Sequence, residues 1–297
     1  MTSVTLSVHI SLAALAMFVL KAWRSTAFAL YGYLNFTKAG FLEHSKRFKP
    51  EDMEAKIPGK NCIITGANSG IGYATAEGLA QRGATVYLVC RNKERGEAAL
   101  SKIQSTTGNQ NVHLEVCDLS SVSEIKSLAS RFSKKDVPVH MLKAAPDARV
   151  ITVSSGGMYA SPLTTDLMYS ESNFKGVEQY SRNKRVQVAL TEKWAEKYMN
   201  KGIGFYSMHP GWAETPGVAR SLPSFNEKLK GKLRTSEEGA DTVIWLALQA
   251  KDKLVPGAFY FDRAEAPKHL KFAAATGSHA LIDSIISSLN SMASLSA

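Results

Sequence analysis

The chain has 297 residues, a mass of 32.3 kDa and a formal net charge of +10. Its length allows one large hydrophobic core without requiring a second, and a content of 44% hydrophobic and 21% charged residues is ordinary for a globular α/β protein. The positive charge permits contact with anionic lipid or nucleic acid. No nucleic-acid-binding module or aromatic-interleaved basic motif occurs, so we predict no nucleic-acid partner.

Residues 4–20 are almost entirely apolar and are followed by Lys21 and Arg24. A stretch of this length is at the short end of what spans a bilayer, and the positive charge behind it would keep the next domain in the cytosol. We therefore predict an N-terminal apolar helix, residues 1–24, that anchors the protein to a membrane such as the endoplasmic reticulum. A cleaved signal, or a buried or interfacial helix of a cytoplasmic protein, is the alternative.

Residues 25–57 are predicted to form a basic connector, and residues 58–297 a single domain. Between residues 21 and 60, eight Lys/Arg oppose four Asp/Glu. The aromatic-rich stretch 27–36 within the connector is suited to lie along a membrane surface. The three cysteines of the chain lack metal-ligand spacing and fall in or beside predicted strands, which indicates buried thiols and no metal site; they are Cys62, Cys90 and Cys117.

A glycine-rich turn follows the apolar run 62–64 and precedes a stretch of good helix formers that stops at Gly83. Strand, glycine turn and helix are the context of a dinucleotide-binding fingerprint, although the spacing T-G-x3-G-I-G is not the commoner one. Gly66 permits a sharp turn, Gly70 a close approach to a pyrophosphate, and Gly72 tight packing of the helix. An ordinary βα turn is the alternative. The residues of this turn predicted to bind the cofactor are Gly66, Asn68, Ser69, Gly70, Ile71 and Gly72.

The next predicted strand, residues 84–90, is followed by Arg91. A site for NAD usually has an acidic residue here, whereas an arginine suits a 2′-phosphate, so we predict NADP(H) rather than NAD(H). An arginine in an exposed loop is the alternative. A helix over residues 93–105 is then followed by a strand that ends near Asp118, which could contact the adenine, cap the next helix, or do both.

Residues 148–157 are predicted to form a buried strand that ends in two serines. Further on, Tyr180 and Lys184 are four residues apart in a predicted helix and therefore share one face. A nearby ammonium lowers the pKa of a phenol and so favours acid–base work by the tyrosine, while a serine hydroxyl could hold the substrate oxygen. A surface helix pair is the alternative, because Y-x3-K is frequent by chance.

Together these motifs resemble the short-chain dehydrogenase/reductase family over about residues 58–263, on "GANSGIG", "VYLVCRN", "RVITVSSGGM" and "SMHPGWAETPGV". The resemblance implies a Rossmann-type doubly wound parallel sheet with helices on both faces. It also implies Tyr180 as the acid–base, Lys184 as its electrostatic partner and ribose ligand, and Ser155 as the ligand of the substrate oxygen. The other implied cofactor contacts are Asp118 at the adenine, His209, Pro210 and Gly211 along the nicotinamide, and Thr215 at its carboxamide.

The chain departs from this family in one place. Family members carry an Asn-Asn-Ala-Gly turn after the fourth strand and then a helix with a catalytic asparagine, whereas here the predicted strand 137–142 runs almost directly into the strand at 148. Thr65 and Ser155 are 90 residues apart, about 35–45 fewer than the resemblance implies, and adjacent parallel strands need a crossover of a dozen or more residues. We therefore expect a fold shortened by the loss of one crossover unit.

The function implied by the resemblance is an NADP(H)-dependent oxidoreductase that interconverts an alcohol and a carbonyl. Membrane proximity favours a small, lipophilic substrate. The alternative is a catalytically impaired shortened form that binds nucleotide or a protein partner without turnover.

Overall fold

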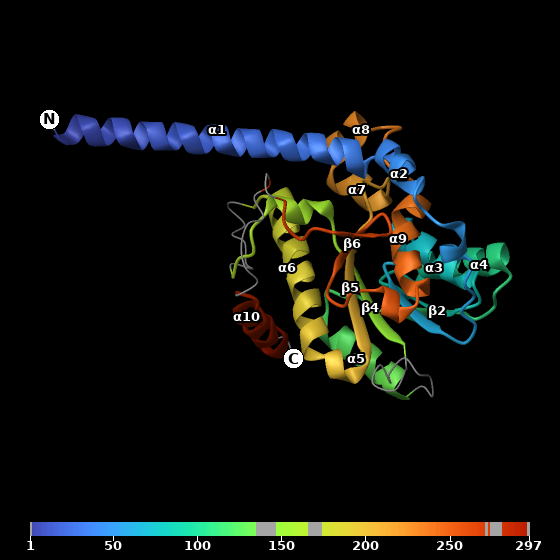
Figure 1. Ribbon diagram of the computed structural model, residues 1–297. Helices are drawn as coiled ribbons and strands as arrows, with labels where there is room; N and C mark the ends of the chain where they lie inside the picture. Colours follow the sequence, from blue (N-terminus) through green and yellow to red (C-terminus); the bar gives the residue numbers. More distant parts are fainter. Residues whose placement is uncertain (1, 135–146, 166–173, 271–272, 274–280, 296–297) are drawn as a thin grey trace.

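The computed structural model describes residues 2–134, 147–165, 174–270, 273 and 281–295, with side chains from residue 14 onward. As predicted, the architecture is α/β, with helices packed on parallel sheets (Figure 1). The described strands are β1 (Asn61–Thr65), β2 (Thr85–Cys90), β3 (Val112–Val116), β4 (Ala148–Val153), β5 (Ile203–His209), β6 (Phe259–Phe261) and β7 (Ala264–Ala266). They form a parallel sheet β1-β2-β3 and a second sheet β4-β5-β6-β7, in which only β7 is antiparallel.

The helices begin and end largely where the sequence predicts. Helix α4 is capped by Asn92, whose side chain accepts a hydrogen bond from the Arg95 amide, and it stops at Gly108 with a left-handed φ of 72°. The described α-helices are α1 (Thr2–Phe36), α2 (Lys38–Ser45), α3 (Gly70–Ala80), α4 (Lys93–Thr107), α5 (Val122–Lys134), α6 (Gly176–Lys197), α7 (Pro216–Ser221), α8 (Pro223–Lys228), α9 (Ser236–Leu248) and α10 (Ile282–Leu295). A 3-10 turn at Gly156–Ala160 directly follows the two serines after β4.

Strand β2 shows how the two faces of the sheet are covered. Its side chains alternate, so that Val86, Leu88 and Cys90 join an apolar cluster under α3, α4 and α9, while Tyr87 and Val89 join another under α5. This nearly continuous apolar composition is typical of a parallel strand that is buried on both faces. Cys90 and Cys117 are buried, as predicted, and Cys62 is half-buried; all three are free thiols.

The sheet is interrupted at its centre. Among the described residues no strand lies between β1 and β4, and the predicted strand 137–142 falls outside them. The apolar cluster under α3 and α9 continues across the interruption, but on the opposite face α5 and α6 cover separate clusters. Ile63, in the middle of β1, is 40% exposed, whereas a central strand of a parallel sheet is normally buried on both faces. Within the described residues, the two sheets are thus joined through one face only.

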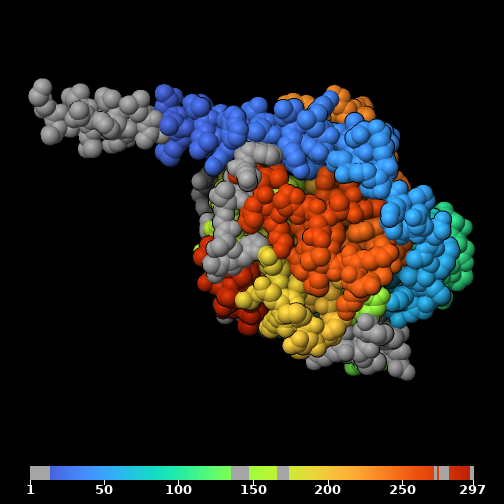
Figure 2. Space-filling model, in the orientation of Figure 1, coloured from blue at the N-terminus to red at the C-terminus, as the bar shows by residue number. Residues whose placement is uncertain are grey.

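The N-terminal segment is one long helix, α1, followed by the short helix α2 within the predicted connector. Within the residues that the structure describes, no helix is long and apolar enough to cross a membrane. The blue part of α1 extends beyond the rest of the molecule in Figure 2. At its other end, Phe36 is buried in a cluster with Met158, Tyr159 and Phe259.

The hairpin between β6 and β7 turns through only two residues. These are Asp262 and Arg263, with φ of 47° and 58°, and they are the only described residues other than glycine with a positive φ. A two-residue loop with both φ positive matches the right-handed twist of the flanking strands but is strained for side chains larger than Asn or Asp. The turn directs Asp262 to Arg234 and Arg263 to Asp241.

The first prediction concerns Gly72, at the start of α3. A Cβ at this position would collide with the carbonyl group of Gly66 and lie 3.2 Å from Ala67 Cα, so the glycine allows the helix to approach the strand end. Gly72→Ala should lower the free energy of unfolding by about 1–3 kcal/mol, as expected for overpacking against backbone. Urea denaturation measures this change.

Gly217→Ala is the matched control, because the nearest atom to a Cβ there is Thr215 Oγ1 at 3.7 Å. Equal effects of the two substitutions on stability would contradict the close approach at Gly72.

Candidate active site

The glycine-rich turn after β1 presents backbone amides at the N-terminus of α3. Gly66 and Gly70 have φ of 66° and 57°, so both occupy the left-handed region that favours glycine. Ser69 is the N-cap residue of α3, but within the described residues its side chain makes no capping hydrogen bond to the helix. The amides of the first turn, together with the positive end of the helix dipole, are therefore suited to bind an anion.

Beside this turn lies a pocket of about 210 Å³ that is rich in positive charge. Arg91 and Arg95 lie on either side of the start of α4 and Arg220 lies in α7, and all three line the pocket walls, with no acidic residue among the lining residues. The other lining residues are Asn68, Ser69, Asn92, Pro216, Gly217 and Ser221. Three guanidinium groups beside a helix N-terminus form a site suited to phosphate. Of these three arginines, the sequence analysis predicted only Arg91 as a cofactor contact.

Thr215 brings the second half of the chain against the glycine turn. Its Oγ1 accepts a hydrogen bond of 3.1 Å from the amide of Val218 and thereby caps α7. A Cβ on Gly70 would lie 3.1 Å from Thr215 Cγ2, so the two segments are in contact. Two segments that were predicted separately to bind the cofactor are therefore adjacent.

Asp118 lies at the end of the third strand but does not cap the next helix. Its Oδ1 accepts hydrogen bonds from the amide and hydroxyl of Ser120, and these bonds hold the pKa of its carboxyl below the usual value. The cap of α5 is Ser121, whose hydroxyl accepts from the amide of Glu124. The capping role predicted for Asp118 was therefore wrong, because the local turn to Ser120 uses its carboxylate first. The adenine contact stays a prediction.

The predicted catalytic residues converge beside the 3-10 turn after β4. Ser155 caps this turn, because its Oγ accepts from the Gly157 amide at 3.1 Å. A Cβ on Gly157 would lie 3.3 Å from Tyr180 Cε1 and 3.4 Å from Ser155 Oγ, so the tyrosine and the serine flank the same small space. Tyr180 is 48% exposed and therefore open to an incoming molecule.

Lys184 lies one helical turn beyond Tyr180, on the same face of α6. Its Nζ is 5.6 Å from the centroid of the Tyr180 ring and donates 2.9 Å and 3.2 Å hydrogen bonds to Val153 O and Gln187 Oε1. Burial lowers the pKa of its ammonium. Ser154, the first serine after β4, is buried and donates to Lys184 O, which ties the helix to the strand end.

The loop after β5 completes this edge of the molecule. His209 is fully buried, and burial, with the charges of Arg234 and Lys184, lowers the pKa of its imidazole well below the usual value, so the ring is neutral. Its Nδ1 accepts a 2.9 Å hydrogen bond from the amide of Gly156, next to Ser155. Gly211 follows with φ of 77°. All these residues follow the carboxyl ends of parallel strands, where ligands bind in open α/β sheets.

Several residues of this region were not predicted from the sequence. Arg95 and Arg220 line the phosphate-suited pocket, and Phe36 and Arg234 contact the loop after β5. The position of Arg95, one turn after Arg91 at the start of a helix, was a usable signal for the first. No local pattern points to Phe36 or Arg234, because each meets the loop only through the tertiary fold.

Comparisons with known proteins show the family of this chain. The family description "short chain dehydrogenase" matches residues 60–145. A protein from Bos taurus named "Dehydrogenase/reductase SDR family member 12" is 39% identical, with 91% of this chain and 98% of the relative covered. Human "Retinol dehydrogenase 11" is 28% identical, with coverages of 70% and 78%. The chain belongs to the short-chain dehydrogenase/reductase family and shares its classification among oxidoreductases.

Solved structures agree on the fold. The structure of L-sorbose reductase from Gluconobacter frateurii, complexed with NADPH and L-sorbose, superposes with a TM-score of 0.53 at 18% identity, and the match covers 70% of this chain and 96% of that one. At this identity the likeness extends to the fold alone.

The Bos taurus relative also differs from this chain in length within the matched region. The match extends over 312 positions, more than the 297 residues of this chain, of which 91% take part. The relative therefore has residues within the match that face no residue of this chain.

Proposed function

We propose that this protein is an NADP(H)-dependent oxidoreductase that interconverts an alcohol and a carbonyl on a small, lipophilic substrate. The observation that carries the proposal is the convergence of Ser155, Tyr180 and Lys184 at the carboxyl ends of the strands, beside the glycine turn. The names of the relatives, a dehydrogenase/reductase and a retinol dehydrogenase, support this reaction class, and the second supports a lipophilic alcohol.

The residues present fit a phosphorylated dinucleotide. The α3 amides and the left-handed Gly66 and Gly70 form a cradle for the pyrophosphate, and the pocket of Arg91, Arg95 and Arg220 suits the additional 2′-phosphate of NADP(H). The NADPH-bound reductase of similar fold supports the same choice. Thr215 and the residues 209–211 would then lie along the nicotinamide, and Asp118 at the adenine. NADP(H), when bound, supplies or accepts the hydride.

The side chains of this chain account for the proton. In carbonyl reduction Tyr180 donates the phenolic proton to the substrate oxygen, and in alcohol oxidation its phenolate accepts that proton. Ser155 donates a hydrogen bond to the same oxygen and so orients it. Lys184, beside the tyrosine ring, favours the phenolate electrostatically and holds the ribose. Its lowered pKa, caused by burial, makes its own charge state sensitive to alkaline pH.

A membrane location is part of the proposal. Large apolar side chains stand exposed along α1, among them Phe18, Trp23 and Leu30, and Lys21 and Arg24 lie between them. Such a helix is suited to lie on a membrane surface with the domain facing the cytosol, which would bring the site close to a lipophilic substrate.

The catalytically impaired shortened form is the second candidate. It is favoured by the interruption between β1 and β4, the 40% exposure of Ile63, and a relative that is longer within the match. Loss of a crossover unit would leave apolar surface uncovered and remove one wall of the nicotinamide site. Nucleotide binding by the unit 60–118 would survive, while hydride transfer would not.

The prediction for cofactor choice uses Arg91. Arg91→Ala should weaken NADPH binding by about 1.5 kcal/mol, roughly tenfold in Kd, because one charge-assisted contact to the phosphate is lost, and it should leave NADH binding unchanged. Calorimetric titration of both nucleotides measures the two affinities. Lys93→Ala removes a neighbouring positive charge that is not in the pocket and serves as the control. Equal weakening for both nucleotides would show that Arg91 does not contact the phosphate.

The prediction for catalysis uses Tyr180. Tyr180→Phe should lower kcat for reduction of lipophilic aldehydes and ketones by roughly 10²–10⁴, the usual effect of losing a positioned proton donor. NADPH oxidation, followed by absorbance, measures turnover. Tyr198→Phe, at the other end of α6, is the matched control and should keep wild-type kcat. Wild-type kcat in Tyr180→Phe would refute the acid–base assignment.

The interruption between β1 and β4 provides a test between the active oxidoreductase and the catalytically impaired form. Inserting the corresponding segment of the Bos taurus relative after residue 142 should stabilise the protein by several kcal/mol, since a few hundred Å² of apolar surface would be covered at about 25 cal/mol per Å². Under the second candidate the present chain melts at a lower temperature than the restored chain and shows little turnover, and restoring the segment raises both; under the first candidate the present chain already turns over. Matching melts and matching turnover would show that the segment is dispensable.

A further inference from the structure

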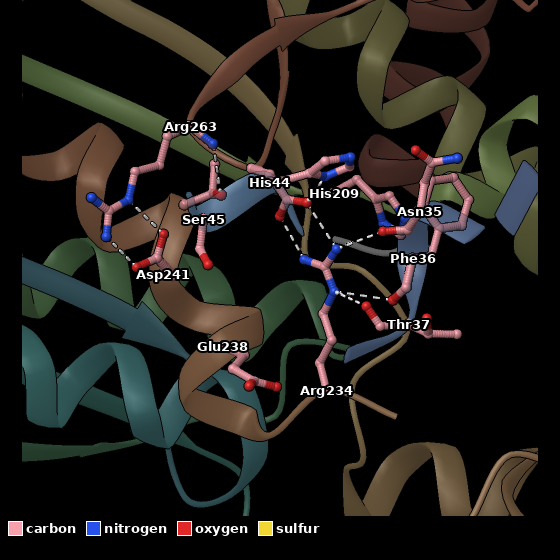
Figure 3. Close-up of polar contacts among 12 residues, drawn as sticks. Asn35, Phe36, Thr37, His44, Ser45, His209, Arg234, Glu238, Asp241 and Arg263 are labelled. Atoms are coloured by element: carbon pink, nitrogen blue, oxygen red, sulfur yellow. Dashed lines mark hydrogen bonds and ion pairs between the residues drawn. The ribbon is translucent and has the colours of Figure 1, made fainter. Parts of the chain in front are cut away.

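A buried arginine lies between the N-terminal segment and the loop after β5. Arg234 is 1% exposed, and its guanidinium makes two hydrogen bonds, 2.5 Å and 2.8 Å, to the carboxylate of Asp262, which is itself buried. The remaining donors reach backbone carbonyls of residues 35–37, at 2.8 Å to Asn35, 3.0 Å to Phe36 and 3.3 Å to Thr37. Figure 3 shows this convergence on Arg234.

The same arginine contacts the loop that is proposed to line the nicotinamide. A Cβ on Gly211 would collide with the Arg234 side chain, so the arginine lies directly against this residue. The amide of Arg234 donates to Trp212 O at 2.8 Å, and the amide of Trp212 donates to Phe36 O at 2.7 Å. The loop is therefore held from one side by the arginine and from the other by the end of α1.

Phe36 carries the contact further, to the catalytic serine. Its ring packs edge-on against His209, with ring centroids 4.3 Å apart. A Cβ on Gly156 would lie 2.6 Å from Phe36 Cε2 and 2.7 Å from His209 Nε2, so these rings close around the residue after Ser155. The hydrogen bond from the Gly156 amide to His209 Nδ1 completes the connection.

We propose that Arg234, Asp262 and Phe36 are positioning residues of the nicotinamide half of the site. They form a clasp, defined by these three side chains, that fixes residues 209–212 and the turn at Ser155–Gly156 relative to each other. His44 extends the clasp, with its Nδ1 2.6 Å from Asp262 Oδ2. This inference rests on the proposed function. Through Phe36, the N-terminal segment, which precedes the nucleotide-binding fingerprint, helps to position the residues of the site.

The buried charges of Arg234 and Asp262 explain why the loop after β5 depends on this ion pair. Removing one member of a buried ion pair leaves the other as an uncompensated charge, which costs far more than the pair itself contributes. Without Asp262, the Arg234 cation would lie buried against Gly211 and near the neutral ring of His209, whose pKa it already lowers. The loop would then move to hydrate the cation, and the nicotinamide surface would move with it.

A neighbouring pair provides a matched comparison. Arg263 makes two hydrogen bonds to the carboxylate of Asp241, at 2.7 Å and 2.5 Å, and this pair is largely buried too. It links α9 to the hairpin turn beside Asp262, and within the described part of the chain its hydrogen bonds do not reach residues 209–212 or 35–37 (Figure 3). Asp241→Asn therefore reproduces the loss of a buried carboxylate without touching the clasp.

The experiment measures the affinity of the full chain for two ligands by calorimetry. NADPH carries the nicotinamide, whereas adenosine 2′,5′-bisphosphate contains only the adenine end. Asp262→Asn should weaken NADPH by about tenfold, a usual magnitude for coupling between separate parts of a protein, and leave the bisphosphate unchanged. Phe36→Leu, which keeps the ion pair, should likewise lower the affinity for NADPH relative to that for the bisphosphate. Asp241→Asn should leave the ratio of the two affinities unchanged.

The binding measurements test the clasp separately from the proposed function. Selective loss of NADPH affinity in Asp262→Asn or Phe36→Leu supports the clasp. The clasp is overturned if the folded Asp262→Asn and Phe36→Leu variants both keep wild-type NADPH affinity. It is also overturned if both ligands are weakened equally in these two variants and in Asp241→Asn. Either result leaves the proposed function standing. Failure of the folded wild-type chain to bind either ligand would overturn the proposed function, and the clasp proposal with it.

Discussion

The apolar layer beneath α3 and α9 is the interaction on which the rest of the structure depends. It contains side chains of β2 and β3 from one sheet and of β5 and β6 from the other, and Ile64 and Val153 of the two interrupted edges pack against it. Because backbone hydrogen bonds do not join the sheets within the described residues, this layer has to keep their strand ends level. The relative position of the glycine turn and of Ser155, Tyr180 and Lys184, which follow strands of different sheets, depends on this layer.

This dependence makes the site asymmetric. Most of the phosphate-suited pocket comes from one stretch of chain, since Gly66, Gly70 and Arg91 belong to one βαβ unit, and α7 adds Arg220. The proposed catalytic side is assembled from distant segments, with Ser155 after β4, Tyr180 in α6 and His209 at the end of β5. The proposed binding of the phosphates therefore depends mainly on local sequence, whereas the proposed position of the nicotinamide opposite Tyr180 depends on the whole fold.

The same distinction explains what could be predicted. Strands 61–65 and 85–90, the glycine turn and the helix with Tyr180 and Lys184 are encoded by local patterns of apolar residues, glycines and helix formers, and they were foreseen within a few residues. The capping role of Asp118 was misjudged because a short turn to Ser120 competes for the same carboxylate. Arg234 and Phe36 could not be found, since 198 positions separate them and nothing in either neighbourhood signals the other. The membrane anchor at residues 4–20 stays a prediction.

The hairpin turn at Asp262–Arg263 has a consequence for how this region is read in related sequences. Both residues adopt a backbone conformation that Asn-Gly would occupy with less strain, and each side chain is held by a buried partner. The backbone of the turn is thus strained, and in return two side chains of opposite charge at consecutive positions point inward. A relative with Asn-Gly at this point would have an easier hairpin but could not compensate a buried arginine at position 234. The identity of these two turn residues is therefore a marker, readable from sequence alone, for whether a homologue attaches its N-terminal segment in this way.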